Sequence, residues 1–251
     1  MYSPLKDKQA GGIDYVIVRE NVEGLYASRG GGTNLRDEVA TDTLVITRKG
    51  TEKIVKYAFE LAKRRNGAPV DGKRRVTCVD KSNVLRSYAF FRKVYDDVAA
   101  DYQEIERDYA YIDAMALWQV QRPEFYDVVV AENMFGDIIS DLGAGTVGGM
   151  GMAPSGDIGD KHGLFQPAHG SAPTIAGKGI ANPIATILSG SMMLEWLGIR
   201  HNDNIALNAA KRIEAAVRDV LEKDNILTQD IGGNARTSEI GDAIAERAVR
   251  R

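Results

Sequence analysis

The sequence has one cysteine, seven prolines and no long hydrophobic run among its 251 residues. Cys78 cannot form an internal disulfide, which favours a reducing compartment such as the cytoplasm. Residues 1–12 lack the apolar core of a secretory signal, and no window of about 18 apolar residues predicts a membrane span. Lys and Arg (32) nearly balance Asp and Glu (35), without a basic tail. Neither nucleic acid nor a membrane is therefore expected as a partner.

The standard glycine-rich nucleotide motifs are also missing, although the chain has 26 glycines. Neither G-x-G-x-x-G nor a Walker loop occurs. Many of the glycines gather in residues 143–163, together with Pro154, and a second group lies in 170–179. The first group predicts a crossover between two domains, which we place at 1–147 and 148–251.

Short apolar runs alternate with amphipathic helices along the first part of the chain. The predicted strands are 13–18, 44–47, 76–79, 110–112 and 128–131. The predicted helices are 51–65, 84–102, 182–196 (ending at Gly198), 204–223 and 238–250. Strands that alternate with helices predict an α/β fold with a mixed, largely parallel sheet.

The strongest local signal is the stretch Glu132–Asp141, which directly follows a predicted buried strand. Asp137 and Asp141 are four residues apart, so a helix would place both carboxylates on one face. Two such carboxylates repel each other unless a cation lies between them, and Mg²⁺ or Mn²⁺ suits oxygen ligands. The alternative is one acid at a helix N-terminus and another on a solvated face.

Other polar residues follow predicted strands. Lys81 could carry a proton, or it could lie on the surface after an N-cap aspartate. Arg19 and Tyr26 follow the first strand; arginine suits carboxylates and tyrosine suits proton donation, although either could brace a turn. Asp113, taken alone, is most simply a helix N-cap.

A glycine-rich loop, 169–183, precedes the helix that Asn182 and Pro183 begin. Its backbone amides could cradle phosphate or adenine, although such a loop is more often a simple turn. His162 and His201 have no recognisable partner and are interpreted as surface residues. Cys78, within a predicted strand, is interpreted as an inert core thiol.

Five motifs occur in one order, and together they resemble a known family. They read V-R-E-N-x-E-G-x-Y, V-D-K-S-N-V-L, Y-I-D-A-M-A, A-E-N-M-F-G-D-I-I-S-D-L and H-G-S-A-P-x-I-A-G-K-G-I-A-N-P. This order closely resembles the isopropylmalate/isocitrate dehydrogenases, a family of β-decarboxylating dehydrogenases that also includes tartrate and homoisocitrate enzymes. The resemblance runs from about Pro4 to the C-terminus and implies a two-domain fold of the isopropylmalate dehydrogenase type.

The resemblance implies a role for each motif. Tyr26 and Lys81 match the catalytic pair, Lys81 reaching in from a partner subunit, and Arg19 matches an arginine that binds the malate-like part of the substrate. Asp137 and Asp141 match metal ligands of one subunit, and Asp113 a metal ligand from the other. The residues that match the cofactor loop are His169, Gly170, Ser171, Ala172, Pro173, Thr174 and Asn182. A homodimer with shared active sites is therefore expected.

The implied activity is a metal-dependent oxidative decarboxylation. Hydride passes from a malate-type 2-hydroxy acid to a nicotinamide cofactor, and Mg²⁺ or Mn²⁺ stabilises the charge that develops as CO₂ leaves. A 3-isopropylmalate- or tartrate-like substrate is expected, with isocitrate and homoisocitrate as alternatives. NAD is the expected cofactor and NADP the alternative. NAD-dependent relatives usually have an aspartate at the position of Thr174, and NADP-dependent relatives tend to have a lysine and an aromatic residue where this chain has Thr174 and Ile175, so the chain matches neither pattern.

Two further departures from the family pattern bear on activity. Gln166 stands where the family usually has a glutamate before P-x-H-G. Family members also carry roughly a hundred residues, about the size of a small domain, before the strand that opens this chain. The resemblance therefore implies an N-terminally incomplete fold, with the alternative that the chain dimerises and binds metal without turnover.

Overall fold

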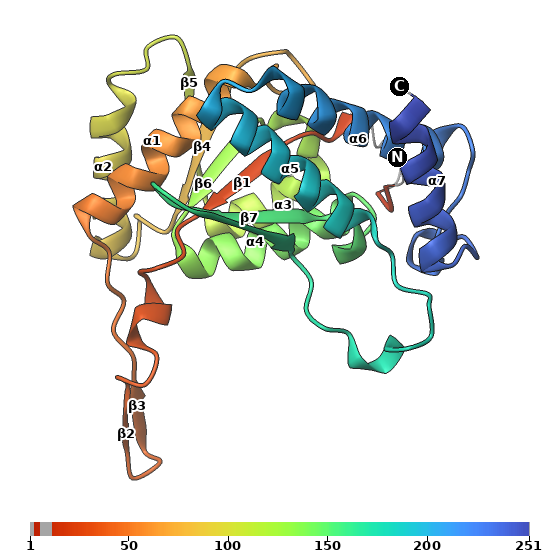
Figure 1. The fold of residues 1–251 in the computed structure, drawn as a ribbon. Coiled ribbons are helices and arrows are strands. Elements are labelled where there is room, and N and C mark those ends of the chain that lie inside the picture. The colour runs from red at the N-terminus through yellow and green to blue at the C-terminus, as the bar shows by residue number, and fades with distance from the viewer. Residues whose placement is uncertain (1–2, 6–11, 251) are drawn as a thin grey trace. The chain divides into compact units, whose positions relative to one another are not determined.

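The computed structural model describes residues 3–5 and 12–250, and the polar lead before the first strand lies mostly outside them. The chain divides into two compact units (Figure 1). Residues 12–143 form one, here called the sheet unit, and 144–250 with 3–5 form the other, the helical unit. The division falls at the start of the glycine-rich stretch, just before the expected boundary at 147.

A parallel four-stranded sheet forms the centre of the sheet unit. Its strands are β1 (Val16–Arg19), β6 (Val128–Ala131), β4 (Arg75–Asp80) and β5 (Glu106–Tyr111), in the spatial order β1-β6-β4-β5. All three pairings are parallel. The α/β class with a parallel sheet is thus confirmed, and antiparallel pairing occurs, among the described residues, in two separate hairpins.

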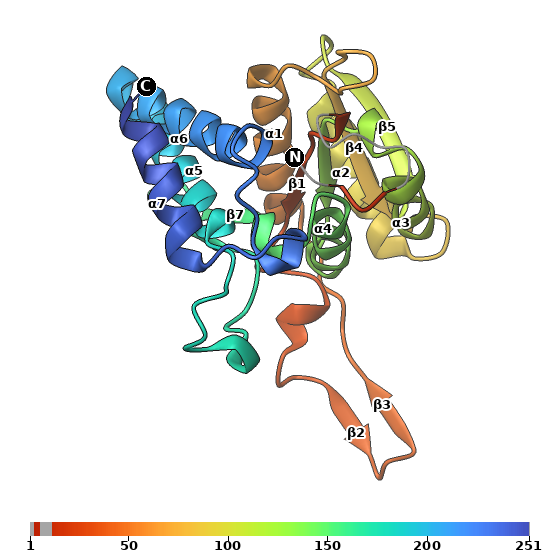
Figure 2. The same ribbon diagram turned by 90° about the vertical axis from the view of Figure 1, so that its right-hand side faces the viewer.

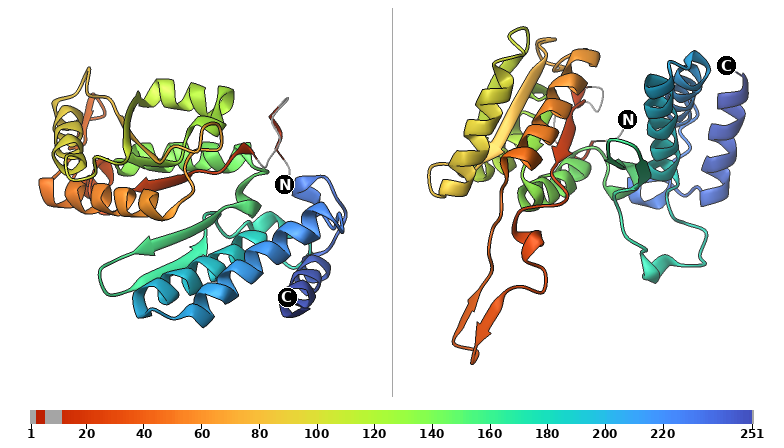
Figure 3. Two further views of the ribbon diagram at one scale, coloured as in Figure 1. Left: turned by 90° about the horizontal axis from the view of Figure 1, so that it is seen from above. Right: turned by 60° about the vertical axis from the view of Figure 1, so that its left-hand side comes forward.

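Helices cover both faces of this sheet (Figure 3). The sheet unit contains α1 (Arg48–Arg64), α2 (Arg86–Ala99), α3 (Ile112–Gln121) and α4 (Asn133–Thr146). Because successive side chains of a strand point to opposite faces, Val128 and Val130 of β6 pack with α1 and α2, whereas Val129 and Ala131 pack with α3 and α4. Burial on both faces explains why β6 is a continuous apolar run.

Two short 3₁₀ helices complete the path around this sheet. Residues Leu25–Ser28 form η2 after the first strand, and Pro123–Phe125 form η3 before β6.

Cys78 lies in β4 and is fully buried, and burial raises the pKa of its thiol, as expected for an inert core residue.

A narrow antiparallel hairpin projects from the sheet unit (Figure 2). It consists of β2 (Thr33–Leu35) and β3 (Val39–Thr41), and every residue of both strands is exposed. The sequence analysis does not predict it. The strand expected at 44–47 is wrong: Val45 makes a single bridge to Gly24, and Thr47 caps α1 by accepting a hydrogen bond from the Gly50 amide.

The helical unit is built from a hairpin and three long helices. Strands β7 (Pro154–Ile158) and β8 (Gly163–Pro167) pair antiparallel, and α5 (Ile184–His201), α6 (Asn204–Glu222) and α7 (Thr237–Arg250) follow. Short turns η4 (Met150–Met152), η5 (Pro173–Ile175) and η6 (Gln229–Ile231) connect them. Its core gathers apolar side chains from η4, α5, α6, η6 and α7.

Helix α5 does not end at Gly198, as the sequence analysis expects. It continues to His201 and ends at Asn202, whose φ of 52° is left-handed. Gly198 is required for packing instead, because a Cβ there would lie 2.7 Å from Leu207 of α6. The glycine therefore marks a close helix–helix approach rather than a helix end.

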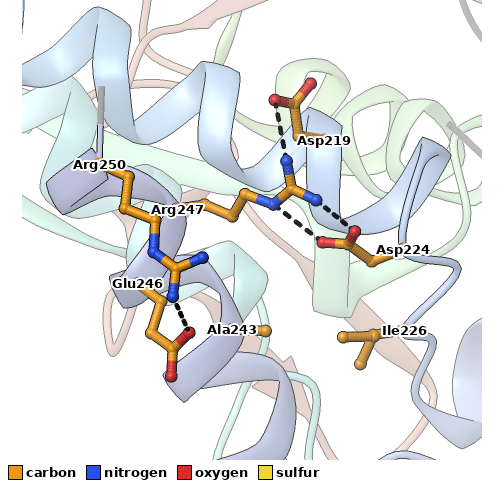
Figure 4. A pocket seen from close by; sticks show the side chains of 7 residues that line it. All are labelled: Asp219, Asp224, Ile226, Ala243, Glu246, Arg247 and Arg250. Atoms are coloured by element: carbon orange, nitrogen blue, oxygen red, sulfur yellow. Dashed lines mark hydrogen bonds and ion pairs between the residues drawn. The ribbon is translucent and has the colours of Figure 1, made fainter.

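Ion pairs join α7 to the end of α6 (Figure 4). Arg247 bonds both oxygens of the Asp224 carboxylate and approaches Asp219. Arg212 of α6 also donates to the carbonyl of Ala248. These contacts fix the last helix to the unit.

Among the described residues, no helix has the length and apolar character that a membrane span needs.

Candidate active site

The candidate residues of the sheet unit follow strands at one edge of the sheet. Parallel strands all end at the same edge, and Arg19, Lys81, Asp113 and Asn133 each end a strand or follow one closely. Two groups of side chains form there. One joins Arg19, Tyr26 and Asp137, and the other joins Lys81 and Asp113.

Arg19 is held between the end of β1 and the first turns of α4. Its Nη1 donates to Asp137 Oδ1 at 2.6 Å, and its Nε and Nη2 both donate to Asn133 Oδ1, at 3.0 and 2.9 Å. The approach needs a glycine: a Cβ on Gly136 would lie 2.7 Å from Cγ of Arg19. Gly136 of α4 thus leaves space for the side chain of Arg19, which lies more than a hundred positions earlier in the chain.

Tyr26 meets the same carboxylate from the short helix η2. Its hydroxyl donates to Asp137 Oδ2 at 2.7 Å, and the Arg19 guanidinium lies 5.7 Å from the ring centre. The hydrogen bond to Asp137 raises the pKa of the Tyr26 hydroxyl, because it stabilises the protonated form. Tyr26 therefore keeps its proton at neutral pH.

Glu132 anchors the start of α4 behind this cluster. Its buried carboxylate accepts from the Tyr88 hydroxyl at 2.8 Å and from the Met134 amide at 3.1 Å. Burial and this hydrogen bond raise the pKa of Tyr88. Gly24 makes room for the carboxylate, since a Cβ there would lie 2.0 Å from Glu132 Oε1.

Asp141 lies one helical turn beyond Asp137 on α4, and its side chain is exposed. The two carboxylates share a helix face, as their spacing predicts. Their oxygen donors suit a hard divalent cation. Asp137 accepts one hydrogen bond on each oxygen, and each oxygen keeps a second lone pair that could bind a cation.

Lys81 and Asp113 form the second group, at the ends of β4 and β5. Lys81 Nζ donates to Asp113 Oδ1 at 2.6 Å, and this hydrogen bond holds the pKa of Asp113 below its usual value. Asp113 lies in the first turn of α3, whose N-cap is Tyr111, so its interpretation as an N-cap is wrong. Within residues 3–5 and 12–250, no three acidic, histidine or cysteine side chains of one chain gather closely enough to hold a metal.

The candidate cofactor residues lie in the helical unit, on the long loop between β8 and α5 (Figure 1). The loop is largely exposed, as are His162 and His201, and Ala172 adopts a left-handed φ of 44° just before η5. His169 Nδ1 lies 2.8 Å from the Gly170 carbonyl oxygen. The side chains of Ser171 and Thr174 face solvent.

Asn182 differs from the rest of this loop because it is nearly buried and its side chain is bonded within the unit. Its Nδ2 donates to Asp230 at 3.0 Å, and its Oδ1 accepts from the amide of Ile184, the first residue of α5, whose N-cap is Pro183. A Cβ on Gly151 would lie 2.6 Å from Asp230 and 2.9 Å from Asn182. Asn182 therefore ties the end of the loop to the helices.

Two contributors to the first group have no assigned role in the sequence analysis, namely Glu132 and Asn133. Both belong to the strongest motif, and the signal was present: two polar residues directly after a buried strand, beside a predicted helix start. Tyr88, which bonds to Glu132, lies 44 positions away, and Glu23, which bonds to Asn133, lies 110 positions away, so spacing alone does not reveal them.

Known proteins resemble this chain in sequence and in fold. Residues 1–244 match the family model described as isocitrate/isopropylmalate dehydrogenase. The chain belongs to this family. The sequence-based resemblance to the β-decarboxylating dehydrogenases is thereby confirmed.

Individual relatives of this family member are similar over most of the chain. The 3-isopropylmalate/3-methylmalate dehydrogenase of Methanocaldococcus jannaschii is 48% identical over 94% of this chain and 67% of its own length. The decarboxylating D-malate dehydrogenase of Escherichia coli is 43% identical over 98% of this chain and 68% of its own length. The crystal structure of isocitrate dehydrogenase from Methylococcus capsulatus superposes with a TM-score of 0.82 at 40% identity, over 94% of this chain and 67% of that one.

Two consequences follow from these comparisons. The chain spans about two thirds of the length of the relatives it matches. The relatives act, by their names, on different malate-type acids at similar identity, so overall similarity does not select the substrate.

Proposed function

We propose that the chain provides the substrate and metal site, and part of the cofactor site, of a metal- and NAD-dependent decarboxylating dehydrogenase. The proposed substrate is a malate-type 2-hydroxy acid, 3-isopropylmalate-like or tartrate-like, with isocitrate and homoisocitrate as alternatives; NADP is the alternative cofactor. The observation that carries the proposal is the convergence of Arg19 and Tyr26 on Asp137.

The chemistry of the proposed residues is complementary. Arg19 binds and orients a substrate carboxylate, because a guanidinium matches that anion in shape and charge. Lys81 takes the proton of the substrate hydroxyl, and Tyr26 gives a proton to the carbon that loses CO₂. A divalent cation held by Asp113, Asp137 and Asp141 supplies stabilisation of the developing negative charge when it is bound.

The loop 169–174 is proposed to hold the adenosine part of the dinucleotide, which supplies the hydride acceptor. The exposed backbone of Gly170 and the left-handed turn at Ala172 support an approach by a ligand. Thr174 offers a hydroxyl but no carboxylate to a ribose. Asn182 contributes by fixing the end of this loop.

A homodimer with shared sites is part of the proposal. Asp113 is paired with Lys81 rather than gathered with Asp137 and Asp141 of the same chain, which supports a metal site completed by Asp113 of a second chain. Exposed apolar side chains neighbour that pair: Val84 follows Lys81 closely, and Leu117 lies one turn after Asp113. Apolar side chains of this size are commonly covered in an assembly.

The metal site is tested by titrating the full chain with Mn²⁺ and following free Mn²⁺ by electron paramagnetic resonance. Asp137→Asn is expected to weaken binding by at least about tenfold, because it removes one charged ligand. Asp113→Asn is expected to cause a similar loss if the site is shared between chains. Asp242→Asn, on the exposed surface of α7, is the matched control and should bind as wild type does.

Wild-type affinity in Asp137→Asn would contradict the proposed metal site. A separate assay decides between turnover and the alternative of a dimerising, metal-binding chain that does not turn over. In that assay Mn²⁺, either nicotinamide cofactor and a series of malate derivatives are tested for reduced cofactor.

A further inference from the structure

The Asn133 side chain joins three separate segments around the candidate site. It is the first residue of α4 and only 2% exposed. Its Oδ1 accepts from two nitrogens of Arg19, at the end of β1, and its Nδ2 donates to the Glu23 carbonyl at 2.9 Å. The carbonyl belongs to the turn that leads to Tyr26.

The position of Asn133 is itself fixed by its neighbours. Glu132 accepts hydrogen bonds from the amides at the start of α4, so the first turn of the helix is capped. Gly136 leaves space for the stem of Arg19 on the next turn. A side chain at 133 therefore meets the Nε and Nη2 edge of the guanidinium in a defined orientation.

An uncharged amide is the group that suits these partners. Arg19 and Asp137 already cancel in charge, so a carboxylate at 133 would make the cluster net negative and repel an anionic ligand. It would also set an oxygen acceptor against the Glu23 carbonyl, which needs a donor. An apolar residue would leave two N–H groups of Arg19 and that carbonyl unpaired.

Arg19 retains hydrogen-bonding capacity after these contacts. A guanidinium has five N–H groups. Asn133 takes two of them and Asp137 takes one. The remaining two, on the terminal nitrogens, have no acceptor among the described residues, and the Arg19 side chain is 31% exposed. Two N–H groups on one planar cation match a carboxylate.

We propose that Asn133 is a positioning residue, which fixes Arg19 and the Glu23–Tyr26 turn to α4 without neutralising the charge that Arg19 offers to a ligand carboxylate. The proposal rests on the proposed function for the identity of the ligand. The positioning itself is a property of the chain alone, so the two can be tested separately.

Positioning is measured by hydrogen–deuterium exchange of the Arg19 Nε–H group in nitrogen-15 spectra of the full chain. The signal is assigned by its loss in Arg19→Lys. Asn133→Ala is expected to accelerate this exchange by about tenfold or more, because the acceptor is gone. Asn133→Asp keeps an acceptor and should keep slow exchange. If exchange in Asn133→Ala is as slow as in wild type, the positioning role is wrong.

The effect of a negative charge at position 133 on ligand affinity is measured by calorimetric titration of the Mn²⁺-loaded full chain with D-malate. Asn133→Asp is expected to weaken D-malate binding by about tenfold, although this variant keeps Arg19 in place. The control is Asn208→Asp, which makes an equal charge change at an exposed position on α6 and should leave D-malate binding unchanged. Wild-type affinity in Asn133→Asp would overturn the charge argument.

A third outcome separates this inference from the proposed function. If the wild-type chain with Mn²⁺ binds no D-malate, 3-isopropylmalate, tartrate, isocitrate or homoisocitrate, the proposed substrate site fails. The exchange of the Arg19 Nε–H group still decides whether Asn133 positions Arg19. If Asn133 had only a structural role, Asn133→Ala and Asn133→Asp would lower thermal stability to the same extent. Asn133→Asp would then not combine slow exchange of the Arg19 Nε–H group with weakened D-malate binding.

Discussion

Gly24 and Gly30 have the same backbone dihedral, a φ of +82°, but very different surroundings. A Cβ on Gly24 would lie 2.0 Å from the Glu132 carboxylate, whereas a Cβ on Gly30 would meet nothing within 4 Å. Both sites favour glycine because left-handed backbone is strained for other residues. Gly24 also has a ψ of −154°, a backbone conformation that is essentially open to glycine alone, so a side chain at this site meets both backbone strain and the buried carboxylate.

Gly24→Ala is expected to lower the free energy of unfolding by about 1–3 kcal/mol more than Gly30→Ala, which should cost about 1 kcal/mol at most. The extra loss arises because Glu132 must move away from Tyr88 and from the start of α4, and because the backbone at Gly24 is strained for alanine. Urea unfolding followed by circular dichroism measures both variants. Equal losses would show that neither the displacement of Glu132 nor the backbone at Gly24 adds a cost.

Single residues also show where sequence reasoning is limited. Arg19, Tyr26 and Asp137 were each proposed from local patterns, and the structure brings them into contact. The roles of Glu132 and Asn133 were missed because a buried polar side chain is defined by its partners, and those lie in other segments. Asp113 was assigned to a helix N-cap, a position that Tyr111 occupies.

At the scale of elements, the hairpin of β2 and β3 has an unusual turn. Its central residues, Arg36 and Asp37, both have left-handed φ values, 54° and 58°. Leu35 pairs with Val39, so the loop has three residues, and loop positions with positive φ favour Gly or Asn. Asn34 compensates in part, since its side chain accepts from the Asp37 amide at 3.0 Å.

Asp37→Gly is expected to stabilise this hairpin by up to about 1 kcal/mol, because glycine adopts the left-handed region without strain. Native-state hydrogen exchange at the Glu38 amide, which bonds to the Leu35 carbonyl, should slow several-fold. Glu38→Gly, at a position with ordinary backbone, is the control and should speed exchange. Faster exchange in Asp37→Gly would show that the Asp37 side chain matters more than its strain.

Most elements with a buried face were predicted, although α3 and α4 were not among the predicted helices, and the exposed hairpin of β2 and β3 was missed. The strand at 128–131 was exact, and those at 76–79 and 110–112 lie within one residue of β4 and β5 at their C-terminal ends. Both hairpins were missed: β2 and β3 bury nothing, so they lack the alternation that reveals a strand. The predicted end of α5 at Gly198 was wrong because a glycine that allows close packing and a glycine that ends a helix cannot be distinguished in the sequence.

For the whole molecule, the main feature is that each unit has its own hydrophobic core. The sheet unit contains two apolar clusters, one on each face of its sheet, and the helical unit contains a third. The two units divide at residue 143, at the start of the glycine-rich stretch, and the second unit includes residues 3–5, which no pattern in the sequence indicates.

A fragment comprising residues 12–143 is expected to fold alone, because its sheet is covered on both faces by helices of the same unit. It should keep a cooperative thermal transition and the helix content of the corresponding part of the full chain, measured by circular dichroism. A control fragment ending at residue 131 lacks α4 and should not unfold cooperatively. A broad, non-cooperative transition in 12–143 would contradict this expectation.

The shared direction of the four parallel strands has a practical consequence. Every candidate residue of the sheet unit follows a strand at its carboxyl end, so the turns at the opposite edge are free for modification. Gln103 and Glu104, exposed in the turn between α2 and β5, are the natural place to insert a fluorescent label or an affinity tag. Such a probe would report on unfolding or assembly while leaving the chemistry of the other edge untouched.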